Sequence, residues 1–423
     1  MFKTLRNAWS IPDLRKKMLY TLLMIFVFRL GSFIPVPGLN PQALAELVSE
    51  NNSLFGLMDA FSGGAFSNAT IFAMGITPYI NSSIILQLLT VAIPALERLS
   101  KEGEEGRKVI AKWTRITTVI LAFIQATGLY FGIKGAVLNQ NFASYVTIVA
   151  TFTAGTAFLM WLGEQITEKG VGNGISIIIF SGIVASIPTM AKNLIGSVTQ
   201  FGAPWWTIAL VLVFNLAMIV FVIFITDAER RIPVQYAKRV VGRKMYGGQS
   251  THIPLKVAMA GVIPIIFAMS ILSFPTTIMQ FTGEPTSAFW LGFWRLLTPS
   301  SWVYIVLYLL LIVFFTYFYT AIQFNPIEVA NNMKKNGGFV PGIRPGAPTS
   351  SYISRILSRI TLAGAFFLGI VAVIPLVIAK IYPSIQSVSI TGTSLLIMVG
   401  VALETVKQIE SQMMMRHYKG FLD

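Results

Sequence analysis

The chain has 423 residues, of which 54% are hydrophobic and only 12% charged, with a mean hydropathy of +0.70. A water-soluble domain of this length needs more polar surface, so this composition predicts a membrane protein. There is no cysteine, which excludes disulfides and thiolate chemistry, and the two histidines, His252 and His417, are too few for a His-rich metal site.

The predicted elements are membrane-spanning helices. Residues 1–17 are polar and basic, and no small-residue cleavage site follows the first apolar run, so we expect this run to remain in the mature protein. A helix needs about 20 apolar residues to cross a hydrocarbon core about 30 Å thick. Ten segments are predicted to span: residues 18–37, 69–93, 113–133, 146–163, 175–191, 205–226, 257–281, 302–323, 360–380 and 387–406.

The basic residues are distributed unevenly among the connections between the predicted spans. Of the 32 Lys and Arg, 27 fall in the two termini and the even-numbered connections between spans. Four fall in the odd-numbered connections: Lys134, Lys192, Arg295 and Lys380. Because basic residues are retained on the cytoplasmic side, this division predicts an even number of spans with both termini cytoplasmic.

Arg29 lies inside the first predicted span. One interpretation is that its side chain reaches toward the outer interface, near Gly31 and Ser32. The other is that it lines an aqueous interior.

Ten spans divide into two sets of five, residues 1–195 and 196–423. An odd number of spans in each half predicts that the halves are inverted relative to one another. The second span carries Gly75 and Pro78, and the seventh, which is second in its half, carries Gly261 and Pro264 at the same spacing. This local repeat supports the division.

Residues 53–68, ahead of the second span, are too short and too rich in Gly and Ser to cross a membrane. Asp59 lies in the middle of this segment. The segment 53–68 is expected to be either a half-inserted helix surrounded by protein or a plain external loop.

Two connections, 227–256 and 324–354, are long and basic. Such loops often contact anionic lipid and fix the topology. Their size also fits a docking surface for RNA or for an acidic protein. Gly and Pro around Arg344 predict a shaped turn that presents this side chain.

The sequence shows no equipment for covalent chemistry. It contains no phosphate-binding Gly-rich loop with a lysine and no credible Ser-His-Asp set, so we expect no enzyme activity, catalytic residue, metal site or cofactor. A secondary transporter of a small solute, built from inverted repeats, is the alternative function. Such proteins often carry ionisable groups in mid-membrane, whereas here the span interiors show only Arg29, with Glu164, Asp227 and Glu404 near span ends.

Seven stretches carry a resemblance to a known family. They occur in order at residues 33–38, 72–90, 172–182, 228–239, 249–266, 325–335 and 342–346. The run from Gln249 to Lys256, Gln-Ser-Thr-His-Ile-Pro-Leu-Lys, is the most specific of them. In these stretches the chain resembles the SecY family, the channel-forming subunits of bacterial protein translocation.

The resemblance implies an all-α polytopic protein whose inverted five-helix halves surround an hourglass pore in the bacterial plasma membrane. A ring of aliphatic side chains is expected to close the pore at Ile80, Ile84, Ile179, Ile183, Ile266 and Ile397. The plug, a short helix sealing the outer funnel, is expected at Leu54, Phe55, Gly56, Leu57, Met58, Asp59, Ala60, Phe61, Ser62, Gly63, Gly64, Ala65 and Phe66.

The resemblance also implies a lateral gate, where the second and third spans face the seventh and eighth. Gln87 lies near this seam, and Ala258 stands where the family commonly has Asn. Unfolded preproteins with a signal sequence would pass through the pore, and membrane anchors would leave sideways into lipid. SecE, SecG, the SecA ATPase motor and the ribosome are implied partners. The docking residues are expected to be Arg230, Arg231, Lys238, Arg239, Arg243, Lys244 and Arg344.

Overall fold

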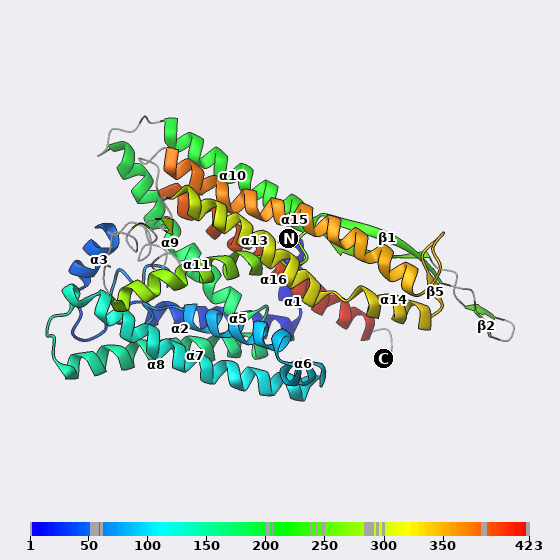
Figure 1. The fold of residues 1–423 in the computed structure, drawn as a ribbon, viewed down its shortest axis with the longest axis horizontal. Coiled ribbons are helices and arrows are strands. Elements are labelled where there is room, and N and C mark those ends of the chain that lie inside the picture. The colour runs from blue at the N-terminus through cyan, green and yellow to red at the C-terminus, as the bar shows by residue number, and fades with distance from the viewer. Residues whose placement is uncertain are drawn as a thin grey trace.

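The computed structural model describes residues 2–50, 59, 62–199, 204, 206–236, 239–241, 244–246, 250–282, 292, 296–297, 301–381 and 387–419. Most of the long helices run roughly along one axis, and a small β-sheet projects at one end (Figure 1). Elements of the first half are α1 Phe2–Ser10, α2 Pro12–Gly31, α3 Pro41–Glu50, α5 Thr77–Ala92, α6 Pro94–Lys101, α7 Glu104–Gly132, η1 Lys134–Ala136, α8 Phe142–Lys169 and α9 Gly174–Thr199.

The second half contains helices and strands. Its helices are α10 Trp206–Asp227, α11 Ile263–Thr282, α13 Trp302–Gln323, α14 Pro326–Lys335, α15 Ala347–Ile381 and α16 Ser387–Lys419. Its strands are β1 Glu229–Tyr236, β2 Arg239–Val241, β3 Lys244–Tyr246, β4 Ser250–Lys256 and β5 Gly338–Phe339.

A helix lies at each of the ten predicted spans. Five described helical stretches are long and apolar enough to cross a membrane: Glu104–Gly132, Phe142–Lys169, Ile208–Asp227, Trp302–Lys335 and Ala347–Ile378. The pair α5 and α6, bent by 103° at Ile93, makes a sixth if it is counted as one span. The helical membrane architecture therefore agrees with the sequence, and the full count of ten crossings stays a prediction.

The second helix of each half begins later than its apolar run. Apolar segments were expected to span from residues 69 and 257, but α5 starts at Thr77 and α11 at Ile263. Turns occupy residues 71–76 and 257–262 instead. Gly75 and Gly261 each adopt φ +58°, a left-handed conformation that ends regular helix and favours glycine. The local repeat seen in the sequence is thus reproduced in backbone geometry.

The long basic connections form a sheet that the sequence did not predict. Strand β1 pairs antiparallel with β4 along its length and with β5 at its end, where Tyr236 faces Gly338. Alternate residues Ile232 and Val234 of β1 are buried, as expected for a sheet with one covered face. They pack with Met333 and other apolar residues of α14 and α15, so residues far apart in sequence share one small core.

The termini meet at one end of the bundle. Helix α1 contacts α16, and Lys17 Nζ donates to Gln412 Oε1 at 3.5 Å. Ala8, Leu14 and Ile409 share a buried cluster with Val171 of the connection between α8 and α9. These segments were all predicted to lie on the cytoplasmic side, so their contact agrees with that topology.

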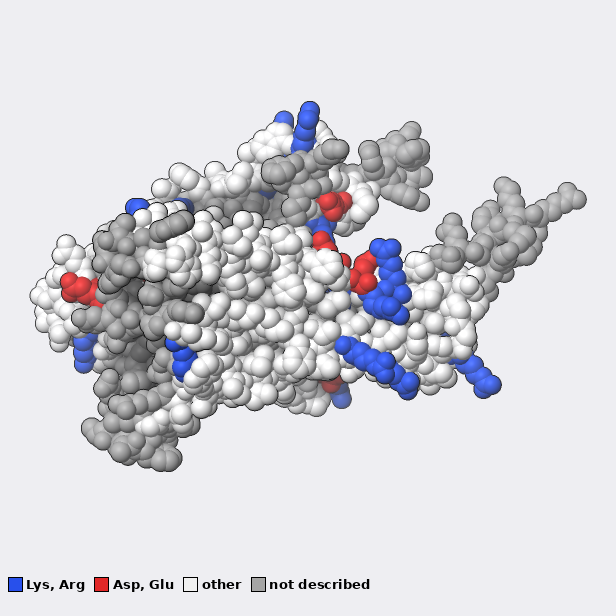
Figure 2. Space-filling model, turned by 90° about the horizontal axis from the view of Figure 1, so that it is seen from above, with Lys and Arg blue, Asp and Glu red and all other residues white. Residues whose placement is uncertain are grey.

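The surface shows an uncharged band. On the face drawn in Figure 2, a broad region without Lys, Arg, Asp or Glu separates charged side chains gathered toward the two ends. Many large apolar side chains are exposed, among them Leu22, Phe224 and Leu310. Exposed apolar surface on this scale requires lipid as the surrounding solvent.

The positive φ at Gly261 gives a test of the repeat. Replacing Gly261 with Ala is expected to lower the free energy of unfolding by about 1 kcal/mol, because an L-residue is strained in this conformation, although no atom lies within 4 Å of the added carbon. Thermal unfolding of the purified protein in detergent measures the change. Gly135→Ala, which also meets open space but has no positive φ, is the control and should unfold near the parent temperature.

Candidate functional site

The isoleucines predicted for the ring come from four helices that converge in the bundle. Ile179 and Ile183 of α9 and Ile397 of α16 are buried in one hydrophobic cluster, which we call the waist cluster. Ile80 of α5 and Ile266 of α11 are half-buried and pack against it. The structure therefore brings together five of the six predicted residues.

The sixth residue, Ile84, is buried in the neighbouring cluster that α11, α13 and α15 share. Ile80 packs against that cluster as well, so it bridges the two groups. The spacing of four places Ile80 and Ile84 on one face of α5, just as Ile179 and Ile183 share one face of α9. An aliphatic ring at these positions, as predicted, would resist wetting and offer no fixed hydrogen bonds to a passing chain.

The described part of the predicted plug lies directly against this cluster. Ser62, Ala65 and Phe66 are buried, and Ala65 belongs to the waist cluster itself. A carbon added to Gly63 would stand 2.8 Å from both Cα and the carbonyl oxygen of Gly182, next to Ile183. Leu54, Phe55, Gly56, Leu57, Met58, Ala60 and Phe61 lie outside the described residues.

Local hydrogen bonds shape this segment. The backbone N–H of Ser67 donates to Asp59 Oδ1 at 2.7 Å, and the N–H of Phe66 donates to Ser62 Oγ at 3.1 Å. The N–H of Gly64 donates to the Asp59 carbonyl at 3.0 Å. Burial raises the pKa of the Asp59 carboxyl, although the hydrogen bonds from Ser67 oppose the shift. The segment is therefore folded onto itself as well as onto α9.

Arg29 also contacts the segment. Its Nη1 donates to the carbonyl of Gly63 at 3.1 Å, and its guanidinium lies 5.3 Å from the ring centroid of Phe33. The side chain thus contacts both the predicted plug and a residue beyond the end of α2, while its two interpretations, at the interface or lining an aqueous interior, stay predictions. The contact with Gly63 could not be read from sequence, because 34 residues separate the partners.

Helix α11 packs against both α5 and α7, the second and third helices of the predicted spans. Gln87 is exposed on α5, and half-buried Ala258 lies in the turn before α11, where its carbonyl accepts from the N–H of Gly261 at 3.2 Å. Ser82 Oγ donates to the carbonyl of Thr114 at 2.9 Å and ties α5 to α7. Helices α5 and α7 therefore contact α11, where the lateral gate is predicted, and whether this contact opens toward lipid stays a prediction.

The predicted docking arginines lie on the sheet and on the turn after β5. Arg230 and Arg231 are exposed on β1, where Arg231 Nε lies 2.7 Å from Glu229 Oε1. Arg344 is exposed in the turn before α15, and its carbonyl accepts from Thr349 Oγ1 at 2.8 Å. Arg239 and Lys244 lie on β2 and β3, whereas Lys238 and Arg243 are outside the described residues.

Comparisons with known proteins agree with this geometry. The family model for SecY matches residues 70–406. The protein translocase subunit SecY of Halalkalibacterium halodurans is 50% identical, and that of Streptomyces coelicolor is 48% identical, with both chains fully covered in each case. The chain belongs to the SecY family. It is thus a subunit of a protein translocase, a function for which the sequence offered only a resemblance.

Solved structures show the same fold at low identity. A protein conducting channel is similar with a TM-score of 0.67 and 17% identity, covering 94% of this chain and 92% of the other. Sec61 in the canine ribosome-channel complex is similar with a TM-score of 0.63 and 16% identity over the same shares. The helical bundle described here is therefore the fold of a protein-conducting channel.

Sequence reasoning missed Gly182, which lets the backbone of Gly63 approach α9. The only signal in the sequence was a glycine within a predicted membrane helix. Such glycines are frequent in membrane helices, so this one could not be singled out. It also missed the strands, whose alternating pattern at Ile232 and Val234 is only two buried residues long.

The contact between Gly63 and Gly182 predicts a local displacement. Gly63→Ala would force two backbone segments apart, so Ser62 is expected to become accessible to water. Because the chain has no cysteine, a single Ser62→Cys substitution reports this directly through labelling by a water-soluble maleimide.

Gly64→Ala is the matched control, since Gly64 also has a positive φ but only Asn68 Nδ2, at 3.9 Å, near the added carbon. Labelling should rise severalfold with Gly63→Ala and stay low with Gly64→Ala. Equal labelling in both variants would show that backbone strain, and not the contact with α9, seats the segment.

Proposed function

We propose that this chain forms a pore that carries unfolded secretory polypeptides across the bacterial plasma membrane and releases transmembrane segments sideways into lipid. One observation carries the proposal: isoleucines from α5, α9, α11 and α16 meet in the waist cluster, and Ala65 of the predicted plug packs into the same cluster. The seal is thus apolar, is built from separate helices and has a detachable segment on one side.

Such a seal suits a passing polypeptide. Aliphatic side chains exclude water and ions when they are in contact, and they adapt to any sequence because no specific hydrogen bond must be broken. The plug would add a second layer, since Ser62–Phe66 are held to α9 by packing and to Arg29 by one hydrogen bond. Displacement of the described residues Ser62–Phe66 would break the hydrogen bond to Arg29 and this packing on α9.

A lateral exit would lie between α11 and the pair α5 and α7. The contact there is between helices of different halves, so the halves can part without breaking either one. Gln87 and Ala258 would border this exit. Since Ala258 offers no polar side chain, the gate in this chain would rely on apolar packing and backbone hydrogen bonds.

The energy for transport would come from partners that dock at the basic face. We place both termini, the sheet and the Arg344 turn on the cytoplasmic side, as the division of Lys and Arg indicates. SecA or the ribosome would bind the sheet and the turn, where Arg230 and Arg344 are exposed. SecE and SecG would complete the complex within the membrane.

The apolar ring is tested by conductance. Ile183→Ser is expected to raise the ion conductance of the resting complex severalfold, because a hydroxyl admits water to the waist. Planar-bilayer recording of the reconstituted complex measures it. Ile409→Ser removes a similarly buried isoleucine from the cluster where the two termini meet and serves as the control. A resting conductance that is unchanged by Ile183→Ser argues against the ring.

The docking proposal is tested by charge reversal. Arg344→Glu should slow SecA-driven transport of a preprotein into vesicles at least tenfold, while the amount of protein in the membrane stays unchanged, because an attractive contact becomes repulsive. The control is Arg98→Glu, the same change at an exposed position of α6 on the same predicted side. Equal loss in both variants would mean that overall charge, not the turn, matters.

A further inference from the structure

A polar groove lies between the start of α14 and the first turns of α15. Its volume is about 610 Å³, which is within the range of sites for small ligands. Part of its lining belongs to the connection 324–354, but the residues proposed for the pore and for docking are not among its lining residues. The side chains that matter for its chemistry are Ile327, Ser351, Ser354, Arg355, Ser358 and Arg359.

The groove is cationic and rich in hydroxyl donors. Arg355 and Arg359 are both exposed, and neither forms an ion pair with any carboxylate among the described residues. Glu328 follows Ile327 on α14 but does not line the groove. Two guanidinium groups beside serine hydroxyls form the donor set that binds a phosphate group.

The groove lies at the depth of lipid headgroups. At the far end of α15, Lys380 Nζ lies 4.4 Å from the ring centroid of Trp302, an aromatic residue typical of the membrane interface. From Arg359 to Lys380, α15 rises about 31 Å at 1.5 Å per residue, which matches the hydrocarbon core. Arg355 lies about 6 Å further out, among the headgroups.

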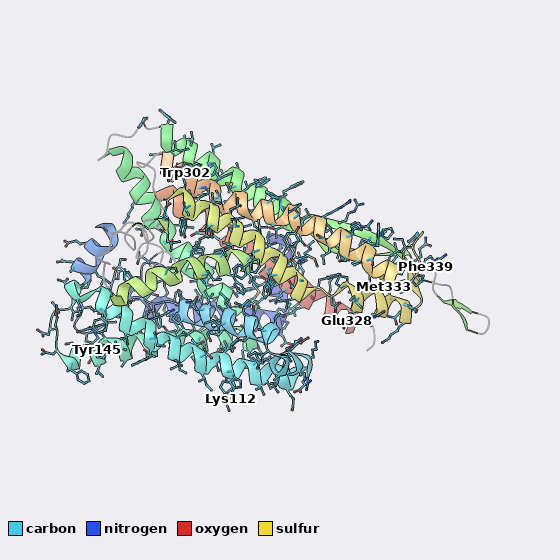
Figure 3. All side chains as sticks on the ribbon, in the orientation of Figure 1. Lys112, Tyr145, Trp302, Glu328, Met333 and Phe339 are labelled. Atoms are coloured by element: carbon cyan, nitrogen blue, oxygen red, sulfur yellow. The ribbon has the colours of Figure 1, made fainter. Side chains whose placement is uncertain are left out.

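Two further observations agree with this depth. Tyr317 of α13 donates its hydroxyl to the Ser358 carbonyl at 3.2 Å, which places a second interfacial aromatic beside the groove. Trp302 lies toward the end of the molecule opposite Glu328 in Figure 3.

The polar face of the groove continues into an apolar stripe. Leu362 and Phe366 follow Arg355 and Ser358 at helical spacing on the same face of α15. They are 44% and 53% exposed, so they face the surroundings rather than the bundle. A ligand held by the arginines would therefore extend along an apolar surface toward the middle of the bilayer.

We propose that this groove binds an anionic phospholipid, whose phosphate contacts Arg355 and Arg359 and whose acyl chain lies along Leu362 and Phe366. The depth and the continuous apolar stripe favour lipid over a soluble partner such as RNA, which would not contact the stripe. The inference does not depend on the proposed pore, because lipid binding is measured without transport.

Native mass spectrometry of the purified complex, titrated with phosphatidylglycerol or phosphatidylcholine, tests the proposal. The double variant Arg355→Gln/Arg359→Gln should bind phosphatidylglycerol about 30-fold more weakly, about fivefold for each arginine, and phosphatidylcholine as before. Lys334→Gln/Lys335→Gln removes the same charge at exposed positions of α14 outside the groove and should change binding less than threefold.

Further measurements distinguish a phospholipid headgroup from free phosphate and from a soluble partner as the ligand of the groove. Inorganic phosphate should not displace the lipid at millimolar concentration, whereas displacement would show that the groove binds the anion alone and would overturn the lipid assignment. Equal loss in the arginine and lysine variants would also overturn it. Arg355→Lys/Arg359→Lys, which keeps both charges, should retain most of the binding. Weakened ribosome binding by the glutamine variant, with unchanged lipid binding, would assign the groove to a soluble partner.

Discussion

A bilayer provides no hydrogen-bond partner for an irregular backbone, so a chain that interrupts its helices at membrane depth must bury the interruption in protein. Among the described residues, the turns before α5 and α11 each lie within a run predicted to span the membrane, and each has a glycine at φ +58°. Ala73 and Met74 in the first turn and Ala260 in the second are buried. The bundle thus packs around these two turns, and the waist cluster forms where the helices that follow them converge.

The waist cluster and the segment over it differ in what holds them. The isoleucines sit on helices, so backbone hydrogen bonds within each helix help to hold their positions. The segment at Ser62–Phe66 depends on short-range bonds from Asp59 and Ser67 and on one close backbone approach at Gly182. The helices therefore hold the isoleucines in place, whereas the segment over them is held by burial of Ala65 and Phe66 and by local hydrogen bonds.

Apolar length predicted where helices lie, because about 20 apolar residues are needed to cross the core whatever the partners are. It misplaced the start of α5, because the left-handed Gly75 keeps the helix from beginning earlier in the apolar run. It missed the sheet, since Tyr236 pairs with Gly338 about 100 residues away and no local pattern encodes that register. The isoleucines were found only through family resemblance, since a buried Ile on its own has no distinctive signal. Whether they seal a pore stays a prediction.

The sheet is joined to the bundle at a narrow place. Strand β1 begins two residues after α10 ends at Asp227, β4 ends at Lys256 just before the turn into α11, and the N–H of Val257 donates to the Ala228 carbonyl at 2.9 Å. A force applied to the paired strands would therefore reach the root of α11 through this connection, as well as α14 and α15 through the core shared with Ile232 and Val234. A molecule that binds and moves the sheet would therefore do mechanical work on the bundle without entering the membrane.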